Sequence, residues 1–147
     1  MIAHSLHARP NEIYFTAGGS ESDNWALKGT AEAYRAKGRH IITTQIEHHA
    51  VLHTCKYLEE QGYEITYLPV DTQGFVNLQQ LEASIRPDTI LISVMFANNE
   101  IGTMEPIAQI GRIARRHEVL FHTDAVQAYG QVPIRVDFYH IDLLSAS

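Results

Sequence analysis

Cysteine is almost absent from the 147-residue sequence, in which Cys55 is the only one. A single cysteine excludes an internal disulfide framework and is typical of a protein from a reducing compartment. Long apolar runs are also lacking: the longest, such as residues 90–97, fall far short of the roughly 20 residues that span a membrane. The first residues have neither the basic nor the apolar stretch of a secretory signal. These absences predict a cytoplasmic protein with no membrane partner.

An excess of positive charge is missing as well. The chain carries 17 acidic residues against 11 lysines and arginines, for a formal net charge of −6 and a pI near 5.8. Proteins that bind nucleic acids usually have a basic surface, so no nucleic-acid partner is expected. The residues that are present, 45% hydrophobic and 19% charged, are typical of a globular domain. A chain of this length can bury a core without disulfides or a structural metal.

Helix-like stretches alternate with short apolar runs along the chain, which is the pattern of a parallel sheet covered by helices. The predicted helices span residues 21–37, 50–61, 78–85 and 106–117. The predicted strands span residues 40–45, 64–69, 89–96, 119–123 and 142–146. Several of these strands are almost continuously apolar, as strands buried on both faces are. The sequence therefore predicts an α/β fold, a three-layer α/β/α domain with a mostly parallel sheet.

The first candidate motif is TAGGSESDN at residues 16–24, which follows the apolar Ile13, Tyr14 and Phe15. A strand, a turn of small residues and a helix N-terminus together present unpaired N–H groups and a positive dipole end, which suit a phosphate. A second interpretation is a tight turn in which Ser20 and Asp23 form a start that resembles a capping box. The two interpretations are compatible, because a capped turn can still hold an anion.

The second motif is Glu47-His48-His49, between a predicted strand and a predicted helix. This is a common place for active-site residues in open α/β sheets, and an imidazole there can stack on a planar cofactor or move a proton near neutral pH. His49 and His53 are four residues apart, as two zinc ligands on a helix can be, but no Glu between them completes a zincin motif. We interpret His53 as an ordinary surface residue.

The third motif is ANNEIGT at residues 97–103, after the most apolar strand. Amide side chains at a strand end can hydrogen-bond a ligand that lies across the sheet edge. Such residues are also ordinary turn formers, and this second role is the one favoured for Asn98 and Glu100.

The fourth motif is FHTDAVQ at residues 121–127, in which Asp124 ends a predicted buried strand. A carboxylate there is costly unless it meets a metal, a base or a protonated ring nitrogen. Capping of the next turn by Asp124 explains the motif equally well.

Taken together, the four motifs resemble those of the cysteine desulfurases of the NifS/IscS type, which are pyridoxal-phosphate enzymes of fold type I in the class V aminotransferase family. The matching text is TAGGSESDNWALKG, IITTQIEHHAV, VMFANNEIGTMEPI and FHTDAVQAYGQVPI, followed by IDLLSAS. The match runs from about residue 12 to residue 147, and four motifs in the family order make it specific. It implies a transferase that converts L-cysteine to L-alanine and leaves sulfur as a persulfide on a mobile enzyme cysteine. The sulfur would serve iron–sulfur cluster or thio-cofactor assembly.

The resemblance also implies roles for individual residues. His48 would stack on the pyridine ring and assist proton transfer, and Asp124 would pair with the ring nitrogen. The other residues implied to bind pyridoxal 5'-phosphate are Gly19, Ser20 and Ser147 at its phosphate, and Asn99 and Gln127 near its phenolic oxygen. The family usually has threonine in place of Ser20, and serine keeps the hydroxyl donor. The implied partners are L-cysteine, a sulfur acceptor or iron–sulfur scaffold protein, and a second copy in a homodimer.

Two features depart from the family. In relatives, the strand that matches residues 143–147 continues into a histidine and the lysine that binds the cofactor covalently, and this sequence has only Lys28, Lys37 and Lys56. The persulfide cysteine of the family also lies further along, and we interpret Cys55 as a core residue. We therefore expect a fragment: an N-terminal remnant over residues 1–11 and part of the cofactor-binding large domain over residues 12–147, inactive alone and at best a weak binder of the cofactor.

Three alternatives stay open. The first is another class V aminotransferase or lyase, because related enzymes share the pairing of an aspartate with the ring nitrogen. The second is a small metal-dependent hydrolase that uses His48, His49, His122 and Asp124, based on ligand-capable residue types alone. The third is a non-catalytic remnant that serves as a dimerisation or scaffold domain.

Overall fold

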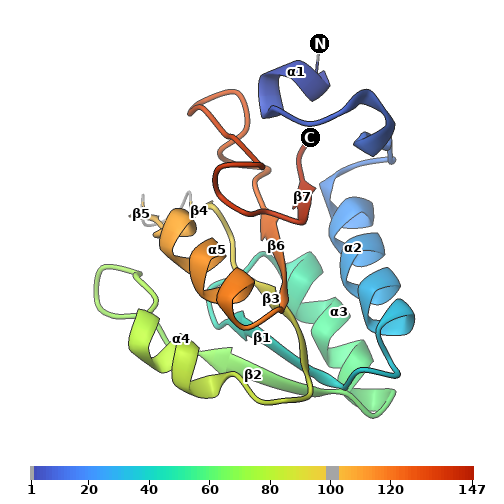
Figure 1. Cartoon of the computed structure of the whole chain (residues 1–147), viewed down its shortest axis with the longest axis vertical. Coiled ribbons are helices and arrows are strands. Elements are labelled where there is room, and N and C mark those ends of the chain that lie inside the picture. Colours follow the sequence, from blue (N-terminus) through green and yellow to red (C-terminus); the bar gives the residue numbers. More distant parts are fainter. Residues whose placement is uncertain (1, 99–102) are drawn as a thin grey trace.

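The computed structural model of the protein describes residues 2–98 and 103–147. Its centre is a five-stranded sheet in the order β2-β1-β3-β6-β7, in which all neighbouring strands run parallel (Figure 1). The strands are β1 (His40–Thr44), β2 (Glu64–Leu68), β3 (Thr89–Ser93), β6 (Leu120–Asp124) and β7 (Leu143–Ser145). A separate antiparallel pair, β4 (Ala97–Asn98) and β5 (Thr103–Met104), follows β3 in the chain.

Helices cover both faces of the sheet. The helices α2 (Gly19–Ala33) and α3 (His49–Glu60) lie on one face, and α4 (Leu78–Ser84) and α5 (Ile107–Arg116) lie on the other (Figure 1). Consecutive side chains of β1 point to opposite faces of the sheet, because side chains alternate along a strand. Neighbouring residues of β1 therefore pack into different apolar cores. Ile41 belongs to the core that contains Leu27 and Cys55, and Ile42 belongs to the core that contains Leu81 and Ile110. The predicted three-layer α/β/α arrangement is confirmed, as is the core position of Cys55.

The four helices and five strands predicted from the periodicity are all present, with ends that differ by a few residues. The helix predicted over residues 21–37 begins earlier, at Gly19, and ends at Ala33. The strand predicted over residues 89–96 ends at Ser93, although residues 94–96 stay buried. Two further short helical segments, α1 (Ile2–Leu6) and η1 (Pro10–Glu12), were not predicted. Leu6 packs into the larger core, so the start of the described chain folds against the domain.

Two predictions for the first motif are wrong. Residues 13–15 do not form a strand, and Tyr14 and Phe15 are 69% and 84% exposed. Apolar residues become a strand only beside a partner strand, and no described strand pairs with this segment. Ser20 and Asp23 do not form a capping box either: Gly18 is the N-cap of α2 and no described side chain caps the helix. Asp23 lies on the same helix face as Leu27 and is buried with it.

The carboxyl ends of the parallel strands meet at one edge of the sheet, where ligands bind in open α/β folds. Glu47 and His48 follow β1 at this edge, and Asp124 ends β6. The N-terminus of α2 lies beside the end of β6, because Gly19 approaches Val126 closely. The fold thus brings together the first, second and fourth sequence motifs.

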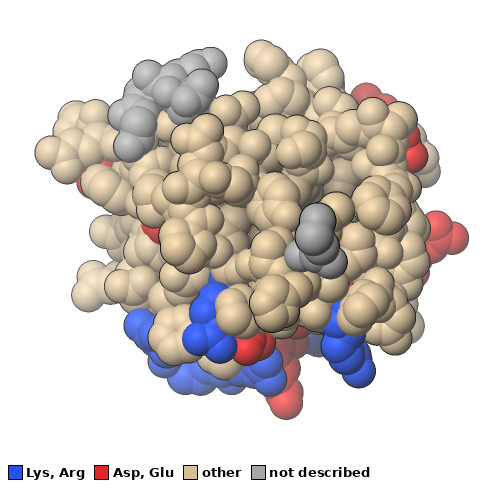
Figure 2. Space-filling model, turned by 90° about the horizontal axis from the view of Figure 1, so that it is seen from above, with Lys and Arg blue, Asp and Glu red and all other residues tan. Residues whose placement is uncertain are grey.

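Charged side chains are unevenly spread over the surface. In Figure 2 the middle of the visible face shows almost no Lys, Arg, Asp or Glu, and Lys and Arg gather along one rim.

Among the helices of residues 2–98 and 103–147, none is both long and apolar enough to cross a membrane.

Candidate functional site

A pocket of about 560 Å³ opens at the carboxyl edge of the sheet. This volume lies within the range of small-molecule and cofactor sites. The sequence-predicted residues that line the pocket are Gly19, Ser20, His48, Asp124 and Gln127. The structure therefore brings together residues that lie more than a hundred positions apart in the sequence.

The N-terminus of α2 forms one wall of the pocket. A Cβ atom built on Gly19 would lie 2.8 Å from Cγ2 of Val126, so a larger residue at position 19 would push this wall outward. The helix has fifteen residues, and no described side chain caps its first turn. Its first N–H groups and its positive dipole end are therefore available to an anion in the pocket.

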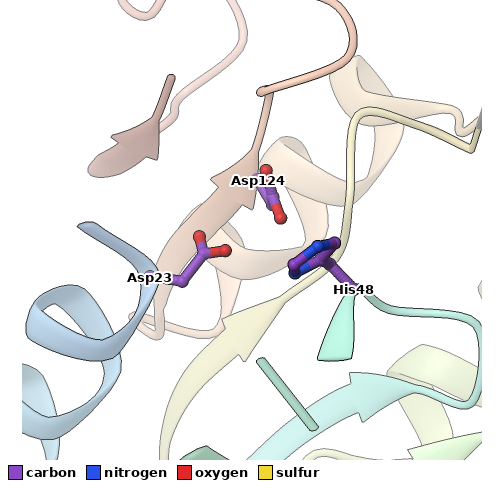
Figure 3. Close-up of side chains that lie close together, drawn as sticks. All are labelled: Asp23, His48 and Asp124. Carbon is purple, nitrogen blue, oxygen red and sulfur yellow. The ribbon is translucent and has the colours of Figure 1, made fainter. Parts of the chain in front are cut away.

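His48 is the N-cap residue of α3. Its Nδ1 atom accepts a hydrogen bond from the backbone N–H of Ala50 at 3.1 Å. A neutral imidazole that accepts at Nδ1 carries its proton on Nε2. The ring points toward Asp124 in Figure 3. His48 therefore has one nitrogen committed to the helix start and one available to a ligand.

Asp124 lies at the base of the pocket, where β6 ends. It is 6% exposed, and its Oδ1 atom accepts a hydrogen bond from the backbone N–H of Val126 at 3.0 Å. The interpretation of Asp124 as a turn cap is thus confirmed, and it does not conflict with a binding role. A carboxylate oxygen can accept more than one hydrogen bond, and Oδ2 takes no part in this bond.

Asp23 is the site residue whose position the sequence did not predict. It comes from α2, is 1% exposed, and offers an oxygen that lies within 4.8 Å of ligand atoms of both His48 and Asp124 (Figure 3). Burial, followed by the negative charge of the neighbouring Asp124, raises the pKa of Asp23 to about 8. The signal that could have found it is the helical spacing of Asp23, Leu27 and Thr30, all of which are buried.

Glu47 is a second buried carboxyl group at the pocket. Its Oε2 atom accepts hydrogen bonds from the Thr44 hydroxyl at 2.7 Å and from the Met95 N–H at 3.0 Å. Its Oε1 atom has no hydrogen-bond partner among the described residues. Burial raises the pKa of Glu47 to about 8, against the opposing effect of these two bonds. The sequence placed Glu47 in a motif but did not predict that it is buried.

His122 is not part of the pocket lining. Its Nδ1 atom lies 2.7 Å from the Ser93 hydroxyl and its Nε2 atom 2.9 Å from the Ser145 hydroxyl. Burial lowers the pKa of His122 to about 4, so the ring is neutral at physiological pH. With both nitrogens engaged, His122 cannot serve as a metal ligand, and the ligand set of the hydrolase hypothesis is not assembled.

Asp23, His48 and Asp124 are close enough to surround a cation. The donor set matches pyridoxal 5'-phosphate better. The start of α2 suits a phosphate dianion, and the buried Asp124 suits a protonated ring nitrogen.

Ser147 and the three lysines, also singled out in the sequence, are not among the described residues that line the pocket. Asn99 and Glu100 fall outside the described residues, next to Asn98 in β4, whose amide donates to the Ile46 carbonyl at 3.3 Å. Ser147 follows β7 and is exposed. The lysines lie elsewhere: Lys28 packs over the Tyr57 ring and Lys37 donates to the Glu118 carbonyl.

Curated relatives match the chain over nearly its whole length. It is 65% identical to "Cysteine desulfurase IscS" from Methanosarcina thermophila over 145 residues, which cover 99% of this chain and 36% of the relative. The chain thus spans about a third of the length of the curated relatives that it matches.

Solved structures share the fold. A structure titled "SspA in complex with cysteine" superposes with a TM-score of 0.95 at 47% identity, over 99% of this chain and 42% of the other. A structure titled "NIFS-LIKE PROTEIN" superposes with a TM-score of 0.92 at 44% identity, over 98% and 40% of the two chains. The sequence also matches the family described as "Aminotransferase class-V" over residues 1–147. The chain therefore belongs to the class V aminotransferase family, whose enzymes depend on pyridoxal 5'-phosphate.

Proposed function

We propose that this chain is part of the cofactor-binding domain of a pyridoxal-phosphate-dependent cysteine desulfurase. The observation that carries the proposal is that Gly19 and Asp124 line the same pocket, with an anion-binding helix start on one wall and a buried carboxylate at the base. The names of the relatives support this reaction over the other reactions of the family, since they are called cysteine desulfurase and NifS-like protein. A related protein has also been solved with cysteine bound.

The overall reaction moves one sulfur atom. L-cysteine and an enzyme thiol become L-alanine and an enzyme persulfide, so that the carbon–sulfur bond breaks, a sulfur–sulfur bond forms, and no external oxidant is needed. When bound, pyridoxal 5'-phosphate supplies an electron sink for the bond changes at the substrate.

Residues of this chain hold the cofactor and move protons. The N–H groups at the start of α2, with Gly19 and the Ser20 hydroxyl, bind the phosphate. The Asp124 carboxylate would accept a hydrogen bond from the N–H of the cofactor ring nitrogen, which favours the charged form of that nitrogen. His48 would stack on the cofactor ring and would move protons through Nε2, since its Nδ1 atom accepts a hydrogen bond from the Ala50 N–H.

Three further residues complete the proposed site. Asn99 and Gln127 hydrogen-bond near the phenolic oxygen of the cofactor, and Ser147 adds its hydroxyl to the phosphate site. Gln127 has the support of lining the pocket.

The residues required for turnover come from outside this chain. Cys55 is buried in the core, and burial raises the pKa of its thiol to about 12, so it is not the persulfide carrier. None of the lysines belongs to the pocket lining. We infer that the covalent lysine and the sulfur-carrying cysteine follow Ser147 in a full-length enzyme. That enzyme acts as a cytoplasmic homodimer and passes sulfur to an acceptor or iron–sulfur scaffold protein.

Two experiments test the proposal. In the first, the purified 147-residue chain is treated with pyridoxal phosphate and borohydride and then mapped by mass spectrometry. We expect no stable cofactor adduct, and stoichiometric labelling of Lys28, Lys37 or Lys56 would contradict the proposal. In the second, the full-length enzyme encoded by the gene is given L-cysteine. We expect alanine and persulfide in equal amounts, whereas transamination of other amino acids in place of desulfuration would favour the wider family.

A further inference from the structure

The Asp23 carboxyl group has no role in the proposed function, although it lines the pocket. It projects from the first turns of α2, and its Oδ1 atom has no hydrogen-bond partner among the described residues. A buried polar atom without a partner costs free energy, so this group requires an explanation. In Figure 3 the side chains of Asp23, on α2, and Asp124, at the end of β6, lie close together.

Among the described residues, no lysine or arginine forms an ion pair with either of the two carboxyl groups. A basic side chain that does lie beside Asp23 is His122, whose Nε2 atom is 3.6 Å from Asp23 Oδ1. That nitrogen is already within hydrogen-bond distance of the Ser145 hydroxyl, and burial lowers the pKa of His122 to about 4. The ring is therefore neutral and cannot balance a second negative charge.

Two neighbouring buried carboxylates without a cation do not both stay ionised. The Oδ1 atom of Asp124 accepts a hydrogen bond from the Val126 N–H, and a backbone donor of this kind favours the carboxylate form of an acidic side chain. Asp23 has no such donor at Oδ1, and burial together with the charge of Asp124 raises its pKa. The shared proton therefore belongs to Asp23.

The other titratable groups around Asp23 agree with this assignment. On the segment between β1 and α3, Glu47 has a pKa raised to about 8 by burial, and His48 supplies the third member of the cluster. From β7, Ser145 partly opposes the rise of the pKa of Asp23. None of these groups brings a fixed positive charge to the base of the pocket.

We propose that Asp23 is a positioning residue: its neutral carboxyl group donates a hydrogen bond to the Asp124 carboxylate and thereby holds that carboxylate, ionised, toward the ring nitrogen of the cofactor. This role rests on the proposed function. A donor to Asp124 favours its ionised form, and an ionised Asp124 favours a proton on the ring nitrogen. Asp23 thus acts on the cofactor through Asp124.

The predicted consequences differ between two substitutions. Asp23→Asn keeps a neutral hydrogen-bond donor of the same shape, whereas Asp23→Leu removes the donor and keeps a similar volume. Had Asp23 been ionised, Asp23→Asn would remove a negative charge beside the cofactor and alter the ring nitrogen strongly. The asparagine variant therefore distinguishes the neutral form from the charged form.

The test uses the full-length enzyme loaded with pyridoxal phosphate that carries ¹⁵N at the ring nitrogen, with the ¹⁵N chemical shift followed from about pH 6 to pH 9. We expect the unsubstituted enzyme and Asp23→Asn to show a protonated ring nitrogen over the same pH range and affinities for the cofactor within about threefold of each other. In Asp23→Leu we expect the signal to move toward the unprotonated form and the affinity to fall by about tenfold, the effect of one lost hydrogen bond to a charged group.

Several outcomes would overturn the role of Asp23. A change in Asp23→Asn as large as that in Asp23→Leu would show that Asp23 acts as an anion, and an unaltered signal in Asp23→Leu would show that it does not act on the cofactor. If the leucine variant does not fold, Asp23→Ala, which also lacks the donor, takes its place in the comparison. Failure of the unsubstituted enzyme to bind the labelled cofactor would contradict the proposed function instead, and with it this role.

Discussion

Gly19 at the start of α2 and Val126 after β6 lie so close together that a Cβ atom at position 19 would be 2.8 Å from the Val126 Cγ2 atom. This approach joins the two halves of the site. Gly19 belongs to the helix start that we propose binds the cofactor phosphate. Val126 lies two positions after Asp124, whose carboxylate we propose binds the ring nitrogen. The distance between the phosphate site and the ring-nitrogen site therefore depends on the absence of a side chain at position 19.

Gly19→Ala is expected to weaken binding of pyridoxal phosphate by about tenfold, because the stiff valine side chain cannot give way without moving the loop after β6, at a cost of ~1–2 kcal/mol. Removing the opposing methyl groups should relieve the clash, so Gly19→Ala with Val126→Ala should recover most of the affinity. Equilibrium titration of the full-length apoenzyme measures both. A double variant that binds no better than Gly19→Ala would show that the contact does not set the geometry.

His48 has a structural role that can be separated from its proposed chemistry. His48→Ala should destabilise the protein by ~1 kcal/mol, because the Ala50 N–H loses its acceptor at the start of α3. His48→Asn, with an amide oxygen in reach of that N–H, should restore the melting temperature. Both variants should lose most of the alanine-forming activity, since neither has an imidazole. Full activity in His48→Asn would mean that His48 only caps the helix.

Cys55 should resist alkylation in the folded protein. It is fully buried, and burial raises the pKa of its thiol to about 12, so almost no thiolate forms at neutral pH. Iodoacetamide should label Cys55 only after denaturation, as measured by mass spectrometry. Cys55→Ala should leave sulfur transfer by the full-length enzyme unchanged, and a loss of persulfide in that variant would contradict the assignment of Cys55 to the core.

Glu47 should make the protein less stable as the pH rises. Its folded pKa is about 8 against an ordinary value of 4.5, so between these values the folded protein holds a proton that the unfolded chain has released. The free energy of unfolding then falls with increasing pH and continues to fall up to about pH 8. Glu47→Gln needs no proton, so from pH 6 to pH 8 it should lose ~1–2 kcal/mol less than the parent.

Denaturant unfolding of the apoenzyme at the two pH values measures this difference, and Glu60→Gln, on the exposed end of α3, is the matched control. The contribution of His122 is common to all three proteins and cancels in the comparison, whereas the difference for Glu47→Gln includes the repulsion between Glu47 and Asp23. Equal pH dependence in the parent and Glu47→Gln would show that Glu47 is ionised in the folded state.

Much of the fold follows from local sequence pattern. The apolar runs at Ile41, Ile42 and Leu91 predict buried parallel strands, and the helical spacing of Val51, Cys55 and Leu58 predicts the buried face of α3. Asp124 and His48 are predictable as site residues because they follow strands, and strand ends gather at one edge of the sheet.

Features that depend on distant parts of the chain could not be predicted from the local sequence. Asp23 follows a glycine turn as an ordinary cap residue does, and its burial depends on β6 and β7, which come a hundred residues later. The segment that contains Tyr14 and Phe15 has the composition of a strand, but strand formation requires a neighbour that local pattern does not reveal.

The central claim is that one pocket holds both ends of one cofactor. It is tested most directly by a crystal structure of the full-length enzyme grown with pyridoxal phosphate. We expect the phosphate within hydrogen-bond distance of the backbone N–H groups at Gly19 and Ser20, and the ring nitrogen within hydrogen-bond distance of the Asp124 carboxylate. A cofactor whose phosphate lies away from the start of α2, or whose ring nitrogen faces a residue other than Asp124, would contradict the account.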